Sequence, residues 1–263
     1  MSNKKPSLAV YKFSSCDGCQ LSILNMEDEL LDLAEAVNIA YFLEATRTQK
    51  PGPYDIALIE GSVTTPHEIE SIKEIRAQAK TVIALGTCAT AGGIQALRNF
   101  ANAEEYANEI YPRPEYLQYL DTATPISAHI SVDLELWGCP VNKKQVLEVI
   151  VALLNYRKPN IPPYSVCLEC KQRVAVCVLA DKGFPCLGPC TKAGCNAICP
   201  AMGRGCYGCF GPASETNTNS LITILKKLER QSGETARMFR GISGYSPAFR
   251  EAADLILEEK VTK

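Results

Sequence analysis

Cysteine is the residue type in this chain with the most evident chemistry. The sequence has thirteen cysteines, and nine of them lie between Cys167 and Cys209. Their spacing divides into two sets of four and leaves only Cys190 over. The first set is Cys167, Cys170, Cys177 and Cys186, and the second is Cys195, Cys199, Cys206 and Cys209. Each set supplies four thiols, the number that binds one structural zinc ion or one iron–sulfur cluster.

The spacing within the two sets bears on which metal they hold. Zinc modules usually pair two CxxC units, whereas several cysteines here are separated by three, six or eight residues. Pro200 follows Cys199, as a proline follows the last cysteine of bacterial ferredoxin runs. The pattern favours iron–sulfur clusters, with structural zinc as the alternative. A disulfide framework is disfavoured, because such frameworks belong to small secreted domains and we expect no secretory signal here.

The first half of the chain alternates apolar, strand-like runs with helical patterns. Helical patterns occupy residues 21–33, 69–75 and 146–154. Strands alternating with helices predict an α/β fold with a parallel sheet. The predicted strands are residues 8–13, 37–42, 55–61, 81–85 and 130–136.

The four remaining cysteines follow the ends of predicted strands. Cys16 and Cys19 follow the first strand, Cys88 the fourth and Cys139 the last. Sites in parallel sheets lie beyond the carboxyl ends of the strands, so we expect these thiols to form a third four-cysteine site. Glu60 ends the third strand at the same edge. It is either a group that supports the site or handles protons, or an acid that serves a helix N-terminus or is satisfied within a loop.

Composition limits the remaining possibilities. A chain of 263 residues with 46% hydrophobic residues is long enough for two domains, which we place at residues 1–157 and 158–263. A net charge of −2 argues against nucleic-acid binding, since such proteins carry a basic face. No apolar run approaches the roughly 20 residues that span a bilayer, so we expect no direct membrane insertion. Without a leader, the expected location is the cytoplasm.

These motifs together resemble a known family. CxxC after the first strand, GTC at Cys88, GCP at Cys139 and the PCLGPxTxAGCxAxCP cassette are similar to those of the small, electron-transfer subunit of nickel–iron hydrogenases. The likeness is strongest to the cytoplasmic, NAD(P)-linked type, also called sulfhydrogenases. It covers nearly the whole chain. The related cassettes carry an aliphatic residue where this chain has Cys190, so Cys190 is an alternative to Cys186 as a ligand.

The resemblance implies a fold, cofactors and ligands. It implies a flavodoxin-like parallel sheet domain followed by a smaller, irregular and helical cluster domain, with three 4Fe-4S clusters in all. It assigns the proximal cluster to Cys16, Cys19, Cys88 and Cys139. It assigns the medial cluster to Cys195, Cys199, Cys206 and Cys209, and the distal cluster to Cys167, Cys170, Cys177 and Cys186.

The resemblance also implies partners and a reaction. Hydrogen would be split at the nickel–iron site of a large subunit, and this chain, with no catalytic residue of its own, would relay electrons to a flavin/NAD(P)-binding or ferredoxin-like subunit. Two alternatives stay open. The chain could deliver electrons to a heterodisulfide reductase-type partner, or it could be a zinc-structured binding protein without enzymatic function.

Overall fold

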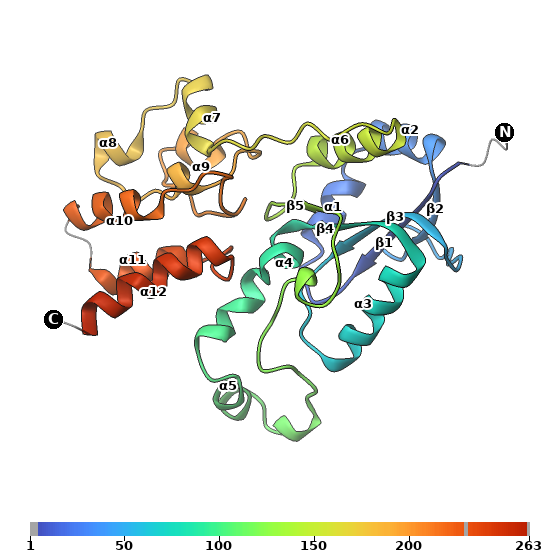
Figure 1. Ribbon diagram of the computed structural model, residues 1–263, viewed down its shortest axis with the longest axis horizontal. Coiled ribbons are helices and arrows are strands. Elements are labelled where there is room, and N and C mark those ends of the chain that lie inside the picture. Colours follow the sequence, from blue (N-terminus) through green and yellow to red (C-terminus); the bar gives the residue numbers. More distant parts are fainter. Residues whose placement is uncertain (1–4, 229–230, 262–263) are drawn as a thin grey trace. The chain divides into compact units, whose positions relative to one another are not determined.

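A computed structural model describes residues 5–228 and 231–261 of the chain. The chain forms two compact units, Met1–Pro159 and Asn160–Lys263 (Figure 1). This division lies two residues after the boundary expected from the sequence. Each unit has a core and a set of cysteines of its own, so each is described separately.

The first unit is built on a five-stranded sheet in which every pairing is parallel. The strand order is β2-β1-β3-β4-β5, which is the doubly wound order of flavodoxin-like folds. The predicted α/β class and parallel sheet are therefore confirmed. The strands are β1 (Ser7–Lys12), β2 (Asn38–Phe42), β3 (Tyr54–Glu60), β4 (Ala79–Leu85) and β5 (Leu134–Leu136).

Four of these strands end in register at one edge of the sheet. Lys12 of β1 pairs with Glu60 of β3, and Glu60 pairs with Leu85 of β4. Leu85 in turn pairs with Leu136 of β5. The loops that leave these strands therefore start side by side, which is what brings distant parts of the chain to one place.

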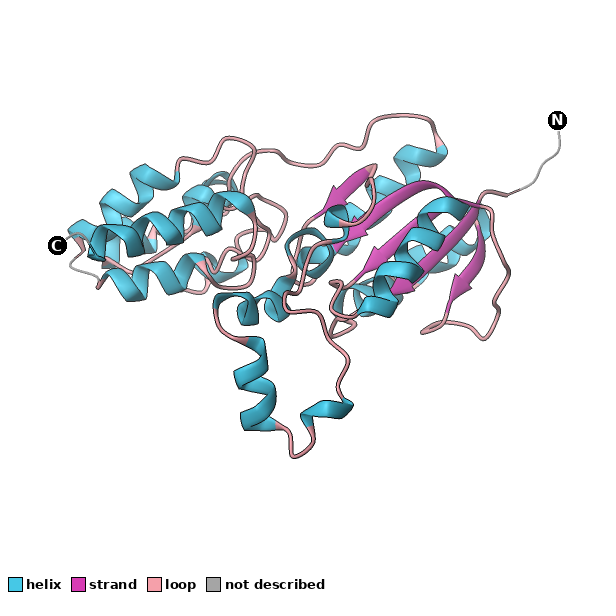
Figure 2. Ribbon diagram, turned by 60° about the horizontal axis from the view of Figure 1, so that its bottom comes forward, coloured by secondary structure: helices cyan, strands magenta, loops and turns pink. Residues whose placement is uncertain are grey.

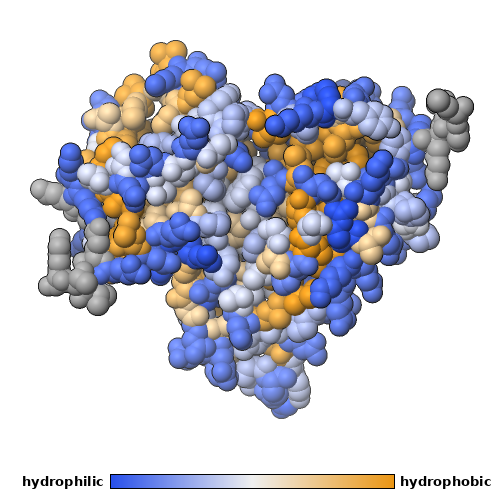
Figure 3. Space-filling view, viewed as in Figure 1, coloured by the Kyte–Doolittle hydropathy of each residue, from blue (hydrophilic) through white to orange (hydrophobic). Residues whose placement is uncertain are grey.

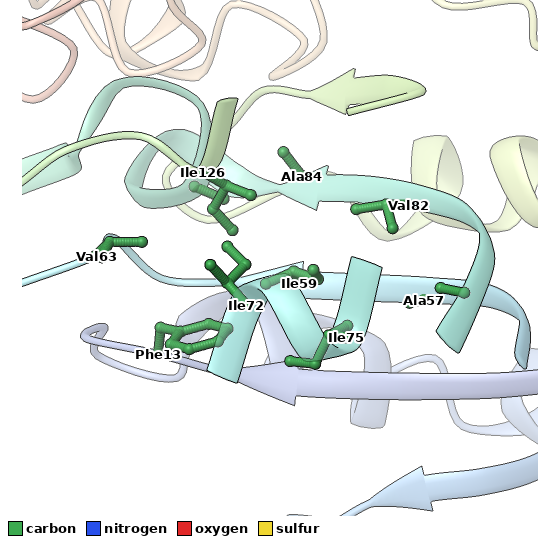
Figure 4. Packing of buried hydrophobic residues seen from close by; sticks show 11 residues of the cluster. Phe13, Ala57, Ile59, Val63, Ile72, Ile75, Val82, Ala84 and Ile126 are labelled. Carbon is green, nitrogen blue, oxygen red and sulfur yellow. The ribbon is translucent and has the colours of Figure 1, made fainter. Parts of the chain in front are cut away.

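Helices cover both faces of this sheet (Figure 2). Below it in Figure 1 lies α3, and above it lie α1, α2 and α6. On the α3 side, Ile72 and Ile75 of the helix belong to one buried cluster with Ile59 and Val82 of the sheet (Figure 4). The helices of this unit are α1 (Gly18–Leu24), α2 (Asp28–Ala36), α3 (Pro66–Gln78), α4 (Gly86–Ala91), α5 (Ala103–Ile110) and α6 (Lys143–Leu154).

Two elements differ from the sequence-based expectation. The last strand begins at Leu134 and not at residue 130, because the Asp133 side chain binds the backbone N–H of Val82 and the Arg76 guanidinium at the sheet edge. The helical pattern over residues 21–33 forms two helices. They are separated around Glu27, whose φ of 56° lies in the left-handed region and interrupts the helix.

The second unit combines irregular segments that carry the cysteines with helices that form its core. Leu221, Leu225, Phe239 and Phe249 are buried there, and the two phenylalanine rings meet edge to face with centroids 5.8 Å apart. The helices are α7 (Val166–Gln172), α8 (Val178–Lys182), α9 (Ile198–Ala201), α10 (Thr218–Lys227), α11 (Ser232–Phe239) and α12 (Pro247–Val261). Among the described residues, no helix has the length and apolar character needed to cross a membrane.

Candidate metal centres

The first candidate site lies at the carboxyl edge of the sheet. Cys16 lies in the loop after β1, and Cys19 in the first turn of α1. Cys88 lies in the first turn of α4, directly after β4, and Cys139 in the loop after β5. Cys19 is buried and Cys16 is exposed, so the site opens at the surface of this unit.

The thiols of this set are close enough to affect one another's ionisation. Burial raises the pKa of Cys88 to about 12, and the nearby Cys139 and Cys16 contribute to the rise. Burial also raises the pKa of Cys139, again with Cys16 nearby. The pKa of Cys19 rises through burial, the Glu60 carboxylate and the neighbouring Cys88 and Cys139. The structure thus brings together the four cysteines that the sequence separates by up to 123 positions.

Glycines without space for a side chain hold these loops together. Gly86 has φ of +84°, and a Cβ atom there would overlap the Cys19 sulfur. A Cβ atom on Gly93 would lie 2.5 Å from the Cys88 sulfur. The backbone N–H of Thr87 donates to the carbonyl of Gly138 at 2.9 Å, which ties the loop of Cys88 to the loop of Cys139.

Gln95 makes a similar link that the sequence did not single out. Its side-chain nitrogen donates to the carbonyl of Ser14 at 2.8 Å, and its side-chain oxygen lies 3.4 Å from the Cys88 sulfur. It therefore joins the loop before Cys16 to the turn that carries Cys88. The only sequence signal is its position seven residues after Cys88.

Glu60 points into the start of α1. Its side chain is 1% exposed, and its two carboxylate oxygens accept the backbone N–H groups of Cys19 at 3.0 Å and Gln20 at 3.3 Å. Burial raises the pKa of Glu60, while the N–H of Cys19 acts to lower it. Glu60 thus orients the helix turn that carries Cys19.

The second candidate site gathers the first cysteine set of the second unit. Cys167 and Cys170 lie on α7, Cys177 immediately precedes α8, and Cys186 follows in a loop. Burial raises the pKa of Cys170 to about 11, with contributions from Cys167, Cys186 and Cys177. The Cys186 sulfur accepts backbone N–H groups from Cys206 at 3.2 Å and from Gly188 at 3.4 Å. The thiols of this set therefore lie near one another, and Cys170 also lies near Cys195 of the other set.

The third candidate site lies beside the second. Burial raises the pKa of Cys195, and Cys199 contributes. Burial also raises the pKa of Cys206, with Cys186 and Cys209 nearby. The Cys206 sulfur accepts the N–H of Gly208 at 3.4 Å. The proximities of Cys206 and Cys199 to Cys186 place the two sets of this unit side by side.

Cys190 is the cysteine that the spacing leaves over, and its thiol lies near that of Cys167. It is 1% exposed and packs in the helical core with Leu187, Leu221 and Phe239. Its sulfur approaches the carbonyl oxygen of Asn217 at 3.5 Å. Backbone N–H groups reach the Cys186 sulfur, whereas Cys190 packs among the apolar side chains of the helical core, so the arrangement favours Cys186 over Cys190 as a ligand.

The donors present fit iron–sulfur clusters. Each set offers four soft sulfur ligands, and backbone N–H groups reach Cys186 and Cys206 as they do around clusters. Glycines at 86, 93 and 188 leave sulfur atoms as their nearest neighbours, so the backbone approaches the thiols without a side chain between. Among residues 5–228 and 231–261, no three His, Cys, Asp or Glu side chains are arranged to hold a single metal ion.

The sequence matches a protein family over much of the first unit. Residues 16–153 match the family described as NADH ubiquinone oxidoreductase, 20 Kd subunit. This region contains Cys16, Cys19, Cys88 and Cys139, the whole of the first candidate site.

Similar proteins extend the match into the second unit. The sulfhydrogenase 2 subunit delta of Pyrococcus furiosus is 38% identical over 221 residues, which cover 84% of this chain and 92% of that protein. A subunit of the F420-non-reducing hydrogenase of Methanocaldococcus jannaschii is 33% identical, over 80% of this chain and 83% of that protein. A chain in the crystal structure of an NAD+-reducing [NiFe]-hydrogenase is 29% identical with a TM-score of 0.56, covering 60% of this chain and 96% of that one.

Proposed function

This chain belongs to the family of the 20 kDa subunit of NADH ubiquinone oxidoreductase and is a small subunit of the nickel–iron hydrogenase type, and from this we propose that it relays electrons through three 4Fe-4S clusters. The single observation that carries the proposal is the gathering of cysteines at two places. Cys16, Cys88 and Cys139 follow strands that end in register at one edge of the sheet, and Cys170, Cys186, Cys195 and Cys206 share one buried cluster in the second unit.

We propose the three ligand sets that the resemblance to hydrogenase small subunits implies. Cys16, Cys19, Cys88 and Cys139 would hold the proximal cluster. The medial cluster would be held by Cys195, Cys199, Cys206 and Cys209, and the distal cluster by Cys167, Cys170, Cys177 and Cys186. When bound, an iron–sulfur cluster accepts and releases single electrons at a potential that its ligands, hydrogen bonds and exposure set.

The residues of this chain would bind and orient those clusters. Burial favours the protonated form of these thiols. Because iron binds thiolates, the thiols must release their protons when a cluster binds. Glu60 fixes the turn that presents Cys19, through the N–H groups of Cys19 and Gln20. Gly86 and Gly93 let the backbone approach the thiols closely. We assign Glu60 a supporting role at the proximal site, since its carboxylate contacts the backbone of a ligand.

A large subunit with a nickel–iron site is the partner we propose at the proximal site. Leu21, Ile94 and Leu97 are exposed apolar residues close in sequence to Cys19 and Cys88, around a site that opens through Cys16. Apolar side chains grouped on a surface mark interaction sites. Hydrogen would be split in that subunit, because this chain offers only cluster ligands at the site.

A second partner would accept electrons at the distal site. Cys177 is exposed there, and Val174, two residues after α7, has 89% of its surface exposed. Val176 is exposed beside them, and apolar side chains gather over α7 and the segment after it (Figure 3). We propose a flavin/NAD(P)-binding or ferredoxin-like subunit as this partner. The flavin/NAD(P)-binding alternative agrees with the NAD+-reducing enzyme among the similar structures.

The test is metal content with electron paramagnetic resonance on the complex purified without oxygen. The wild-type chain should carry about twelve irons and as many sulfides, with signals of interacting 4Fe-4S clusters after reduction. Cys139→Ser should remove about four irons and stop hydrogen-dependent dye reduction, while Cys190→Ala should keep all of them. About three zincs and no signal would overturn the proposal. So would equal iron loss in Cys190→Ala and Cys139→Ser.

A further inference from the structure

Glu169 is a buried acid between two cysteines of the distal set. It lies on α7 between Cys167 and Cys170, and 8% of it is exposed. A carboxylate is seldom buried without partners, because removing it from water is costly. The partners of Glu169 lie outside its own helix, in the loop that carries Cys195 of the other set.

The carboxylate holds that loop through two backbone hydrogen bonds. One oxygen accepts the N–H of Gly194 at 2.9 Å, and the other accepts the N–H of Ala197 at 3.1 Å. The second oxygen also lies 3.9 Å from the Cys195 sulfur. The two donors flank Cys195 on either side, so the carboxylate fixes the backbone that presents this thiol.

The loop needs such a hold because its backbone is strained. Asn196 and Ala197 have φ of 55° and 48°, in the left-handed region that non-glycine residues seldom occupy. Residues in this region keep their conformation only where the surroundings enforce it. Arg173, next to the end of α7, adds a third point of attachment by donating to the carbonyl of Asn196 at 2.8 Å. One short helix thus bears two thiols of one set and positions a thiol of the other.

We propose that Glu169 is a positioning residue that joins the medial and distal sites and lowers the potential of the medial cluster. The inference rests on the proposed function. A carboxylate beside Cys195 opposes the entry of an electron at that site, since like charges repel. The step is the transfer of one electron to or from the proposed medial cluster, and it makes or breaks no bond. Glu60 repeats the arrangement in the first unit, where its carboxylate binds the N–H groups of Cys19 and Gln20.

The experiment is a redox titration of the complex containing Glu169→Gln, followed by electron paramagnetic resonance. The amide keeps the shape of the carboxylate without its charge and keeps one oxygen as an acceptor. We expect wild-type iron content and a shift of one cluster to a more positive midpoint potential. Glu169→Ala removes the hold on the loop and should lose about four irons, with the proximal signal retained.

The matched control is Glu251→Gln, which removes an exposed charge from α12 of the same unit. It should leave every midpoint potential unchanged. Unshifted potentials in Glu169→Gln would overturn the inference, and so would full iron content in Glu169→Ala. If Glu169→Ala fails to accumulate, the titration of Glu169→Gln decides alone. A wild-type complex without iron would instead overturn the proposed function, so the two failures are distinguishable.

Discussion

At the scale of single residues, the proximal site depends on positions that have no side chain. Gly86 brings the first turn of α4 against the Cys19 sulfur, and its φ of +84° is one that glycine adopts far more readily than other residues. Gly93 likewise brings the backbone against the Cys88 sulfur, 2.5 Å from where a Cβ atom would lie. A thiol can face a cluster only if the backbone behind it leaves room, so these glycines matter as much as the cysteines they contact.

Gly86→Ala should therefore remove the proximal cluster. The new Cβ atom would displace the Cys19 sulfur, and we expect about four irons to be lost and hydrogen-dependent dye reduction to fall at least tenfold. Iron analysis and the reduced spectrum measure the loss. Gly183→Ala is the matched control, because φ there is +62° but the added Cβ would meet only Leu228 Cδ2 at 3.6 Å. If both variants lost iron equally, backbone strain and not the contact with Cys19 would be the cause.

At the scale of elements, α3 connects the core of the first unit to the loop before Cys16. Thr65 and Glu68 form a capping box at its start, in which the Glu68 carboxylate accepts the N–H of Thr65 at 2.9 Å. The same carboxylate accepts the hydroxyl of Ser14 at 3.0 Å. The start of this helix is thus fixed by local chemistry and also anchors a loop of the metal site.

Thr65→Ala should lower the free energy of unfolding of the first unit by about 1 kcal/mol, since it removes the side chain that caps α3. Denaturant unfolding of the purified complex, followed by far-ultraviolet circular dichroism, measures the change. Thr65→Ser keeps the capping oxygen and should stay near wild type. Both variants should retain wild-type iron, because Glu68 still holds Ser14. Equal stability of Thr65→Ala and Thr65→Ser would refute the capping role.

At the scale of the whole molecule, burial favours the protonated form of many thiols. Burial is the first cause of a raised pKa in nine cysteines of the two units, while their ordinary pKa is 9.0. Iron binds thiolates, so loading the clusters must release these protons. The nine are Cys19, Cys88, Cys139, Cys167, Cys170, Cys186, Cys190, Cys195 and Cys206.

This predicts an alkaline loss of stability in the cluster-free chain. Below about pH 9 the thiols are protonated in both the folded and the unfolded chain, so they contribute fully to the free energy of unfolding. Above it the unfolded chain releases protons that the fold retains, up to about pH 11 for Cys190 and 12 for Cys88. The free energy of unfolding should therefore fall from pH 9 to pH 11, by as much as about 1.4 kcal/mol per pH unit for each such thiol.

Denaturant unfolding at pH 8, 9.5 and 11 measures the slope. Cys190→Val keeps an apolar side chain in the core. It should reduce the fall of unfolding free energy with pH by at most the contribution of one thiol, about 1.4 kcal/mol per pH unit. The cluster-loaded chain should lack most of the slope, since its ligands carry no proton. An unfolding free energy that stays constant from pH 8 to pH 11 in the cluster-free chain would contradict the prediction.

Much of this molecule could be predicted from short stretches of sequence. Alternating apolar runs and helical patterns predicted the parallel sheet, because the period of a strand or helix is a local property. The end of each strand could be placed to within a few residues, so Cys16, Cys88 and Cys139 could be expected at one edge. The cysteine spacings and the flanking motifs indicated the hydrogenase small-subunit family, which the similar proteins confirm.

Only the tertiary structure decided which groups touch. The partners of Glu169 lie at positions 194 and 197, and those of Glu60 at 19 and 20, with nothing in the spacing to link them. The apolar surroundings of Cys190 come from helices that follow it in the chain, and the late start of β5 comes from contacts of Asp133 with Arg76 and Val82. Local patterns follow from the geometry of neighbouring residues. Contacts between distant segments depend on how whole elements pack, and the identity of one residue does not contain that information.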